Sequence, residues 1–209
     1  MDIRKIESRL LGANCYIITI NNINIIIDPC ISVNELNKYG INNVSYILLT
    51  HAHFDHILYL EEIVNKYNSV IYCHKNATEK IFNDNYNLSN NFNKPLNIHI
   101  DKNKFMFVKD SDVIHIDNLE IDVIYTPGHS SCSVCYMIKD EKVIFTGDTL
   151  FNRSIGRSDF YSGNSFNLAC SLKKLAKLDS DYIIYPGHDE SSTISDQLKY
   201  NTLFLKMIK

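Results

Sequence analysis

The 209-residue sequence lacks several features that mark specialised classes of protein. No apolar run approaches the ~20 residues needed to cross a bilayer, so no membrane association is expected. The start of the chain, residues 1–5, lacks the apolar region of a secretory signal, so we expect a cytoplasmic protein. A formal net charge of −3 offers no basic surface for nucleic acid. The sequence indicates no oligomeric state.

Cysteine is also scarce, since six residues in a chain of this length are too few for a disulfide scaffold. Cys132 and Cys135 form a Cys-x-x-Cys pair. A redox or zinc site would require a turn that brings the two sulfurs together, and a zinc ribbon would require a second such pair. Because the pair lies at the start of the apolar run 134–138, which is typical of a strand, we interpret both residues as buried, reduced thiols.

The hydrophobic pattern predicts strands and helices in two batches, with no internal repeat and no linker rich in proline or glycine. Strands are predicted at 14–20, 23–28, 44–49, 70–73, 113–116, 119–125, 134–138, 142–146 and 182–185. Helices are predicted at 57–67, around Leu168 to Ala176, and from Ser195 onward. Residues 75–110, rich in asparagine and lysine, are expected to form a helix followed by loops. This order predicts one α/β domain over residues 1–209, a sandwich of two mixed sheets.

Side chains able to bind a metal follow the ends of four predicted strands. Three histidines and an aspartate leave strand 44–49 within six residues: His51, His53, Asp55 and His56. Three more candidates each follow a glycine after a later strand: His129, Asp148 and His188. These last three would be weak signals alone, but a core that held the first cluster unpaired would lose several kcal/mol. Because imidazole and carboxylate together suit zinc, iron and manganese, the pattern indicates a metal site.

The chain resembles the metallo-β-lactamase superfamily over nearly its whole length. The resemblance depends on the signature His-x-His-x-Asp-His at 51–56, followed in order by His129, Asp148 and His188. Within that superfamily the chain is most similar to the short, single-domain, glyoxalase-II-like hydrolases. The supporting motifs are Asn-Cys-Tyr at 14–16, Ile-Asp-Pro at 27–29, Thr-Pro-Gly-His at 126–129, Phe-Thr-Gly-Asp-Thr at 145–149 and Gly-Arg-Ser-Asp-Phe at 156–160.

The resemblance implies an αββα sandwich with two metal sites. The first metal would be held by His51, His53 and His129. The second would be held by Asp55, His56 and His188, and Asp148 would bridge the two. Zinc is the expected metal, with iron or manganese as alternatives. Four residues stand where glycine, proline or another small residue is commoner in the family: Cys30, Leu58, Ser131 and Cys132. None is a predicted ligand, so these departures concern the shape of the loops and access to the site, not metal binding.

Two metals ~3.5–4 Å apart would share a water and convert it to a bridging hydroxide near neutral pH. Asp55 would orient that hydroxide or receive its proton. Because a thiolate leaves readily, the predicted reaction is hydrolysis of a small acyl thioester, as in hydroxyacylglutathione hydrolases. The chain ends about twenty residues after His188, so we do not expect the helical domain with which larger glyoxalase II enzymes hold glutathione.

Alternatives remain for the reaction and for individual residues. Persulfide dioxygenases, which use a single iron, also resemble the chain, although glycine at 187 is commoner in the hydrolases. A true β-lactamase would lack the bridging Asp148, and a nuclease would have a basic surface. Arg157 either faces an anionic substrate group or pairs with Asp159 and braces its loop. His74 either lines the pocket or caps the sheet, and His99 and His115 are expected on the surface.

Overall fold

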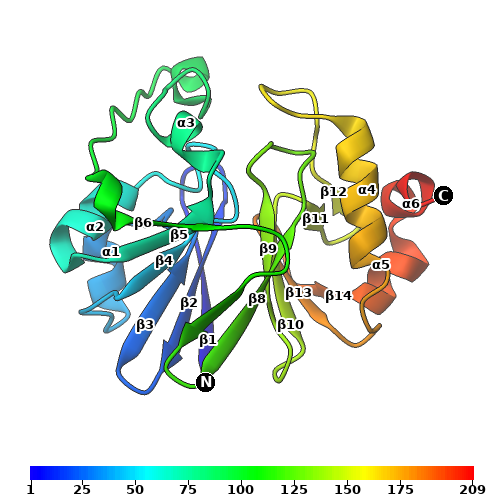
Figure 1. Ribbon diagram of the computed structural model, residues 1–209, viewed down its shortest axis with the longest axis horizontal. Coiled ribbons are helices and arrows are strands. Elements are labelled where there is room, and N and C mark those ends of the chain that lie inside the picture. Colours follow the sequence, from blue (N-terminus) through cyan, green and yellow to red (C-terminus); the bar gives the residue numbers. More distant parts are fainter. The chain divides into compact units, whose positions relative to one another are not determined.

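In the computed structural model, which describes residues 1–209, the first six strands form one mixed sheet in sequence order (Figure 1). Strands β1 to β3 pair antiparallel, whereas β3, β4 and β5 are parallel. The carboxyl ends of these three strands therefore share one edge. The strand bounds are β1 (Asp2–Glu7), β2 (Asn14–Ile20), β3 (Ile23–Ile27), β4 (Tyr46–Leu48), β5 (Val70–His74) and β6 (Phe105–Val108).

Helices cover this first sheet because each has an apolar side. The second helix buries Leu60, Ile63 and Val64. Two glutamates in its first turn interact favourably with the partial positive charge at the helix N-terminus. This helix ends at Asn68, which has the left-handed conformation common at such ends. The bounds are α1 (Val33–Lys38), α2 (Leu60–Tyr67), α3 (Ala77–Ile81) and the short 3₁₀ turns Ser89–Phe92 and Lys102–Lys104.

The second half of the chain forms another mixed sheet, in the order β14-β13-β10-β9-β8-β7. Strands β8, β10 and β13 run in the same direction, because β9 is antiparallel to both β8 and β10 and because β10 is parallel to β13. The bounds are β7 (Val113–Ile116), β8 (Leu119–Tyr125), β9 (Val134–Ile138), β10 (Val143–Gly147), β13 (Ile183–Pro186) and β14 (Ser192–Thr193). A small hairpin joins β11 (Leu150–Phe151) to β12 (Ser154–Ile155).

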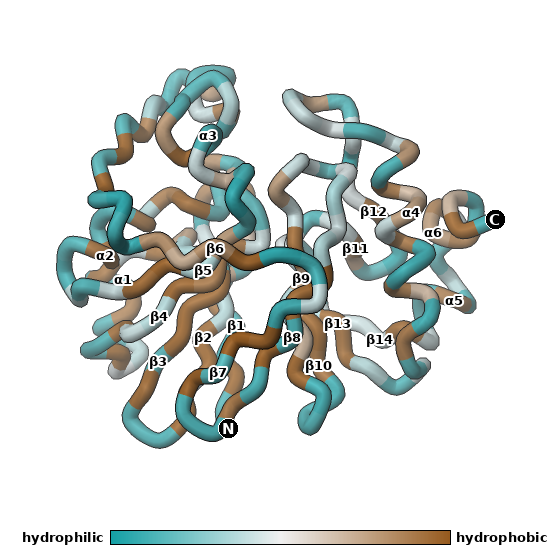
Figure 2. The backbone as a smooth tube through the Cα atoms, in the orientation of Figure 1, coloured by the Kyte–Doolittle hydropathy of each residue, from teal (hydrophilic) through white to brown (hydrophobic).

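Three helices pack on this second sheet: α4 (Ser165–Leu175), α5 (Ile194–Tyr200) and α6 (Thr202–Met207). Their buried side chains share one apolar cluster with the strands, to which the helices contribute Leu168, Leu172, Leu175, Ile194 and Phe204. Figure 2 shows the same division, with hydrophobic residues along the strands and hydrophilic residues in the turns. None of the helices has the length and apolar character needed to span a bilayer.

The chain divides into two compact units, Met1–Phe107 and Val108–Lys209. The predicted strands all lie within a few residues of observed ones. The prediction of a single helix from Ser195 onward was wrong, because two helices, α5 and α6, are present there. Asn201 leaves the helical conformation between them, and its side chain accepts a hydrogen bond from the backbone N–H of Phe204. Strand β6, with two exposed residues at its centre, was not predicted within 75–110.

Candidate metal centre

Four of the predicted ligands lie in the loop that follows β4. His51, His53 and His56 are buried, and the side chain of Asp55 is 13% exposed. The ring centroid of His51 lies 4.8 Å from that of His53 and 4.3 Å from that of His56. Oδ2 of Asp55 lies 3.7 Å from Nε2 of His56. The first unit therefore gathers all four side chains of the signature within one short loop.

Asp28, directly after β3, holds two of these histidines. Its carboxylate accepts hydrogen bonds from the backbone N–H of Thr50 at 2.8 Å and from the Thr50 hydroxyl at 2.6 Å. Its Oδ2 also lies 3.0 Å from Nδ1 of His56, and the Thr50 oxygen lies 3.0 Å from Nδ1 of His51. Because the hydroxyl hydrogen goes to Asp28, the Thr50 oxygen accepts from Nδ1 of His51. The Asp28 carboxylate, which can only accept, takes the hydrogen from Nδ1 of His56. The Nε2 atoms of both histidines are then the ones suited to bind a metal.

The sequence drew attention to Asp28 only as part of the Ile-Asp-Pro motif at 27–29, and we predicted no role for it. Ligand atoms of Asp28, His51 and His56 lie within 4.8 Å of one another, so the three side chains could in principle hold a metal themselves. Both Asp28 oxygens are occupied by hydrogen bonds, which favours a positioning role instead. A signal was available in the sequence, since a carboxylate that ends a strand next to the ligand-bearing strand is well placed to orient the ligands.

Asp28→Asn is expected to lower zinc affinity about 10- to 100-fold, the usual loss when a partner behind a metal ligand is removed. An amide cannot accept hydrogen bonds on both sides, so Thr50 and His56 lose their shared acceptor. Zinc affinity is measured by competition with a chromophoric chelator. The matched control is Asp84→Asn, which removes a carboxylate that binds the backbone of Leu96 and the hydroxyl of Ser89 but no histidine. Equal affinities of the two variants would contradict the positioning role.

The other three predicted ligands lie together in the second unit, at the carboxyl ends of β8, β10 and β13. Oδ2 of Asp148 lies 3.5 Å from Nε2 of His129 and 3.7 Å from Nε2 of His188. His129 is buried, and the side chain of His188 is 23% exposed. A single carboxylate oxygen thus lies within reach of two imidazoles. A carboxylate so placed can bind a metal ion together with either imidazole.

Two glycines align these ligands. The backbone N–H of Gly187 donates to the carbonyl of Gly147 at 2.8 Å, which extends the pairing of β10 with β13 to the residues just before Asp148 and His188. The strand register shifts at this point, and Gly147 has a φ of +48°, a conformation that other residues adopt at a cost. The bulge therefore turns the Asp148 side chain toward that of His188.

A backbone carbonyl sets the tautomer of His129. Nδ1 of His129 lies 2.8 Å from the carbonyl oxygen of Arg157, which can only accept, so Nδ1 carries the hydrogen. The Arg157 guanidinium itself binds both carboxylate oxygens of Asp159 at 2.7 Å and lies 3.8 Å from the centroid of the Phe160 ring. This pair raises the pKa of Arg157 and lowers that of Asp159 to about 2. The predicted pairing of Arg157 with Asp159 is present, and the role of Arg157 toward a substrate stays a prediction.

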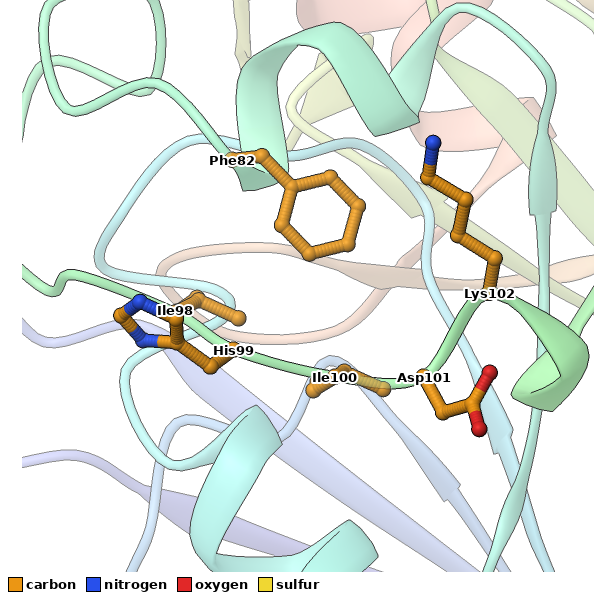
Figure 3. Close-up of a pocket in the computed structure, with 6 residues that line it drawn as sticks. All are labelled: Phe82, Ile98, His99, Ile100, Asp101 and Lys102. Atoms are coloured by element: carbon orange, nitrogen blue, oxygen red, sulfur yellow. The ribbon is translucent and has the colours of Figure 1, made fainter.

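The remaining cysteine and histidine interpretations agree with the structure. Cys132 and Cys135 are buried and form no disulfide, and burial raises the pKa of the Cys135 thiol to about 12. His74 ends β5, where its Nδ1 accepts the backbone N–H of Asn76 and so caps the sheet. His115 and His99 are exposed. His99 lines a shallow pocket of about 410 Å³ with Phe82, Ile98, Ile100, Asp101 and Lys102, toward which the Phe82 ring points (Figure 3).

The donor sets of the two units fit divalent metal ions. The first unit offers three buried imidazoles and the Asp55 carboxylate, and the second offers two imidazoles and the Asp148 carboxylate. Nitrogen and oxygen ligands of this kind suit zinc, iron and manganese. Hydrogen bonds to Nδ1 of three of the histidines hold the rings in the tautomer that metal binding through Nε2 requires.

Comparison with known proteins gives concordant matches. A model of the metallo-beta-lactamase superfamily matches residues 8–188. The probable metallo-hydrolase YqgX of Bacillus subtilis (strain 168) is 31% identical over 193 residues, covering 90% of each chain. Hydroxyacylglutathione hydrolase of Francisella philomiragia subsp. philomiragia is 30% identical over 177 residues, covering 83% of this chain and 62% of that protein. The crystal structure of BLEG-1 B3 metallo-beta-lactamase matches with a TM-score of 0.89 and 27% identity, covering 97% of this chain and 99% of that one. The predicted fold class is thereby confirmed.

Proposed function

Because the chain belongs to the metallo-β-lactamase superfamily, we propose that it is a hydrolase that uses two divalent metal ions to cleave small acyl thioesters. The observation that carries this proposal is the position of Asp148, one oxygen of which lies within 4 Å of Nε2 of both His129 and His188. A carboxylate between two histidines suits a bridge between two cations.

The proposed ligands divide into two sets, and residues 1–209 act in this proposal as one domain. His51, His53 and His129 would hold one metal. Asp55, His56 and His188 would hold the other, and Asp148 would bridge the pair. Zinc is the proposed metal because imidazole and carboxylate suit it and because hydrolysis needs no redox chemistry. The supports for this assignment are the family pattern and the side chains gathered within each unit.

The reaction then divides between the metals and the protein. When bound, the two cations would polarise the thioester carbonyl and lower the pKa of a water between them. Asp55 is the proposed proton acceptor, since its carboxylate lies 3.7 Å from Nε2 of His56 and its side chain is 13% exposed. Asp28 and Thr50 hold the histidine tautomers, so the ligands need no reorganisation during the reaction. A thiolate leaves without a strong general acid.

The thioester is proposed from chemistry and from a relative whose name states such an activity. The Francisella relative is a hydroxyacylglutathione hydrolase, and this chain shares 30% of the aligned residues with it. The test is a panel of acyl thioesters, including S-lactoylglutathione, offered with oxygen esters and a β-lactam to zinc-loaded protein. We expect thioesters to be cleaved fastest. Faster cleavage of the β-lactam than of any thioester would overturn the substrate class.

Arg157 is expected to act on the metal ligands and not on the substrate, because its guanidinium already binds Asp159 through two hydrogen bonds. The hydrogen bonds from Arg157 lower the pKa of Asp159 from 3.8 to about 2, so the contribution of the pair to stability is complete above pH 3.8 and is lost as the pH falls through about 2. Arg157→Met and Asp159→Asn should therefore have similar effects at neutral pH, and the double variant should be no worse than either. A rise in KM for anionic thioesters alone, seen only in Arg157→Met, would instead indicate substrate contact.

A further inference from the structure

The backbone at Gly156 passes so close to the second-unit ligands that no side chain fits there. A Cβ added at Gly156 would come well inside 3.0 Å of the carbonyl oxygen of Asp148, a separation that real Cβ atoms essentially never show. It would also lie 3.2 Å from Cβ of His129. Gly156 is buried, and its N–H donates to the carbonyl of Thr149 at 3.3 Å. The obstacle is the backbone of Asp148, which cannot rotate away as the end of a flexible side chain would.

The next residue continues this contact. The carbonyl of Arg157 accepts the Nδ1 hydrogen of His129 at 2.8 Å, and it does so from the backbone of the same segment. The Arg157 side chain is fixed in turn by Asp159 and by the Phe160 ring. Residues 156 and 157 therefore pack against the backbone of Asp148 and bind the ring of His129.

We propose that Gly156 is a positioning residue for the metal centre, because the missing Cβ lets residues 156 and 157 pack on Asp148 and His129 together. The inference rests on the proposed function, since Asp148 and His129 must bind metal for it to hold. With alanine at 156, the two backbones must separate until the contact reaches the 3.4 Å of ordinary packing. Functional groups tolerate displacements of only about 0.5 Å, so either the Asp148 bridge or the hydrogen bond to His129 is lost.

The test compares Gly156→Ala with Gly40→Ala. Gly40 has a φ of +78°, so alanine is strained there too, but its Cβ would meet no atom within 4 Å and no predicted ligand. Three quantities are measured for both variants and for the unaltered protein: the melting temperature of metal-free protein, the zinc affinity by chelator competition, and the number of zinc ions retained per chain. We expect both variants to melt at lower temperature. Only Gly156→Ala should also bind zinc about 10- to 100-fold more weakly.

The outcomes separate this inference from the proposed function. Equal zinc affinities of Gly156→Ala and Gly40→Ala overturn the positioning role while leaving the metal centre intact. An unaltered protein that retains no zinc overturns the proposed function, and the inference with it. If Gly156→Ala does not fold, Asp159→Asn loosens the same segment from an exposed position. That variant should fold and bind zinc about 10-fold more weakly, and unchanged affinity would overturn the proposal.

Discussion

His53→Ala is expected to lower zinc affinity by far more than the roughly 10- to 100-fold loss that follows removal of a partner behind a ligand. The His53 imidazole is buried within 4.8 Å of the His51 ring, and in the proposed centre it binds the metal directly. Its loss leaves one metal with too few ligands, and thioester hydrolysis should fall by orders of magnitude. The measurements are zinc retained per chain after dialysis and the rate of hydrolysis at saturating substrate.

The matched control for this prediction is His99→Ala. It removes an exposed imidazole from the same unit, so it changes histidine content without touching the proposed centre. We expect His99→Ala to retain zinc and activity at the level of the unaltered protein. Retention of zinc by His53→Ala at the level of the His99→Ala control would contradict the ligand assignment in the first unit.

His56→Ala is expected to empty the second metal position and to abolish most thioester hydrolysis while the chain remains folded. The two metals act on the same water in the proposed reaction, so neither suffices alone. This prediction separates the proposed hydrolase from a persulfide dioxygenase, which needs one redox-active iron and no second metal. Zinc-loaded protein should be fully active, because zinc is a sufficient Lewis acid without redox chemistry.

The assay for this second prediction measures thioester cleavage and oxygen consumption with glutathione persulfide on the same zinc- and iron-loaded samples. His115→Ala, an exposed histidine in the second unit, serves as the control. The protein is a persulfide dioxygenase and not a hydrolase if it is active only with iron, consumes oxygen with glutathione persulfide, and keeps that activity in the His56→Ala variant.

The sequence predicted which residues gather at each sheet edge because their positions follow directly from strand ends. The residues from His51 to His56 all follow one short apolar run, so their side chains leave the sheet at the same edge. Because β4 is parallel to β3 and β5, that edge is formed by the carboxyl ends of all three strands. The same reasoning places His129, Asp148 and His188 at one edge of the second sheet. Prediction succeeded where local pattern and strand direction were sufficient.

Prediction failed where the outcome depends on contacts between distant residues. Asp28 is separated from His56 by 27 intervening residues, so its hydrogen bond to Nδ1 is visible only once β3 and β4 are paired. The division of the C-terminal helix depends on Asn201, whose side chain also donates to the carbonyl of Ser154 at 2.9 Å. The contact of Gly156 with Asp148 likewise depends on how the β11–β12 hairpin returns the chain. No periodicity in the sequence reports these contacts.

Stepwise loading of metal-free protein with zinc, with thioester hydrolysis measured at each step, tests the central claim most directly. The account predicts that the protein takes up about two zinc ions per chain and that most activity appears with the second, because a shared water requires both. Elemental analysis at each step gives the number bound. Full activity with a single ion per chain, and no uptake of a second, would contradict the binuclear centre.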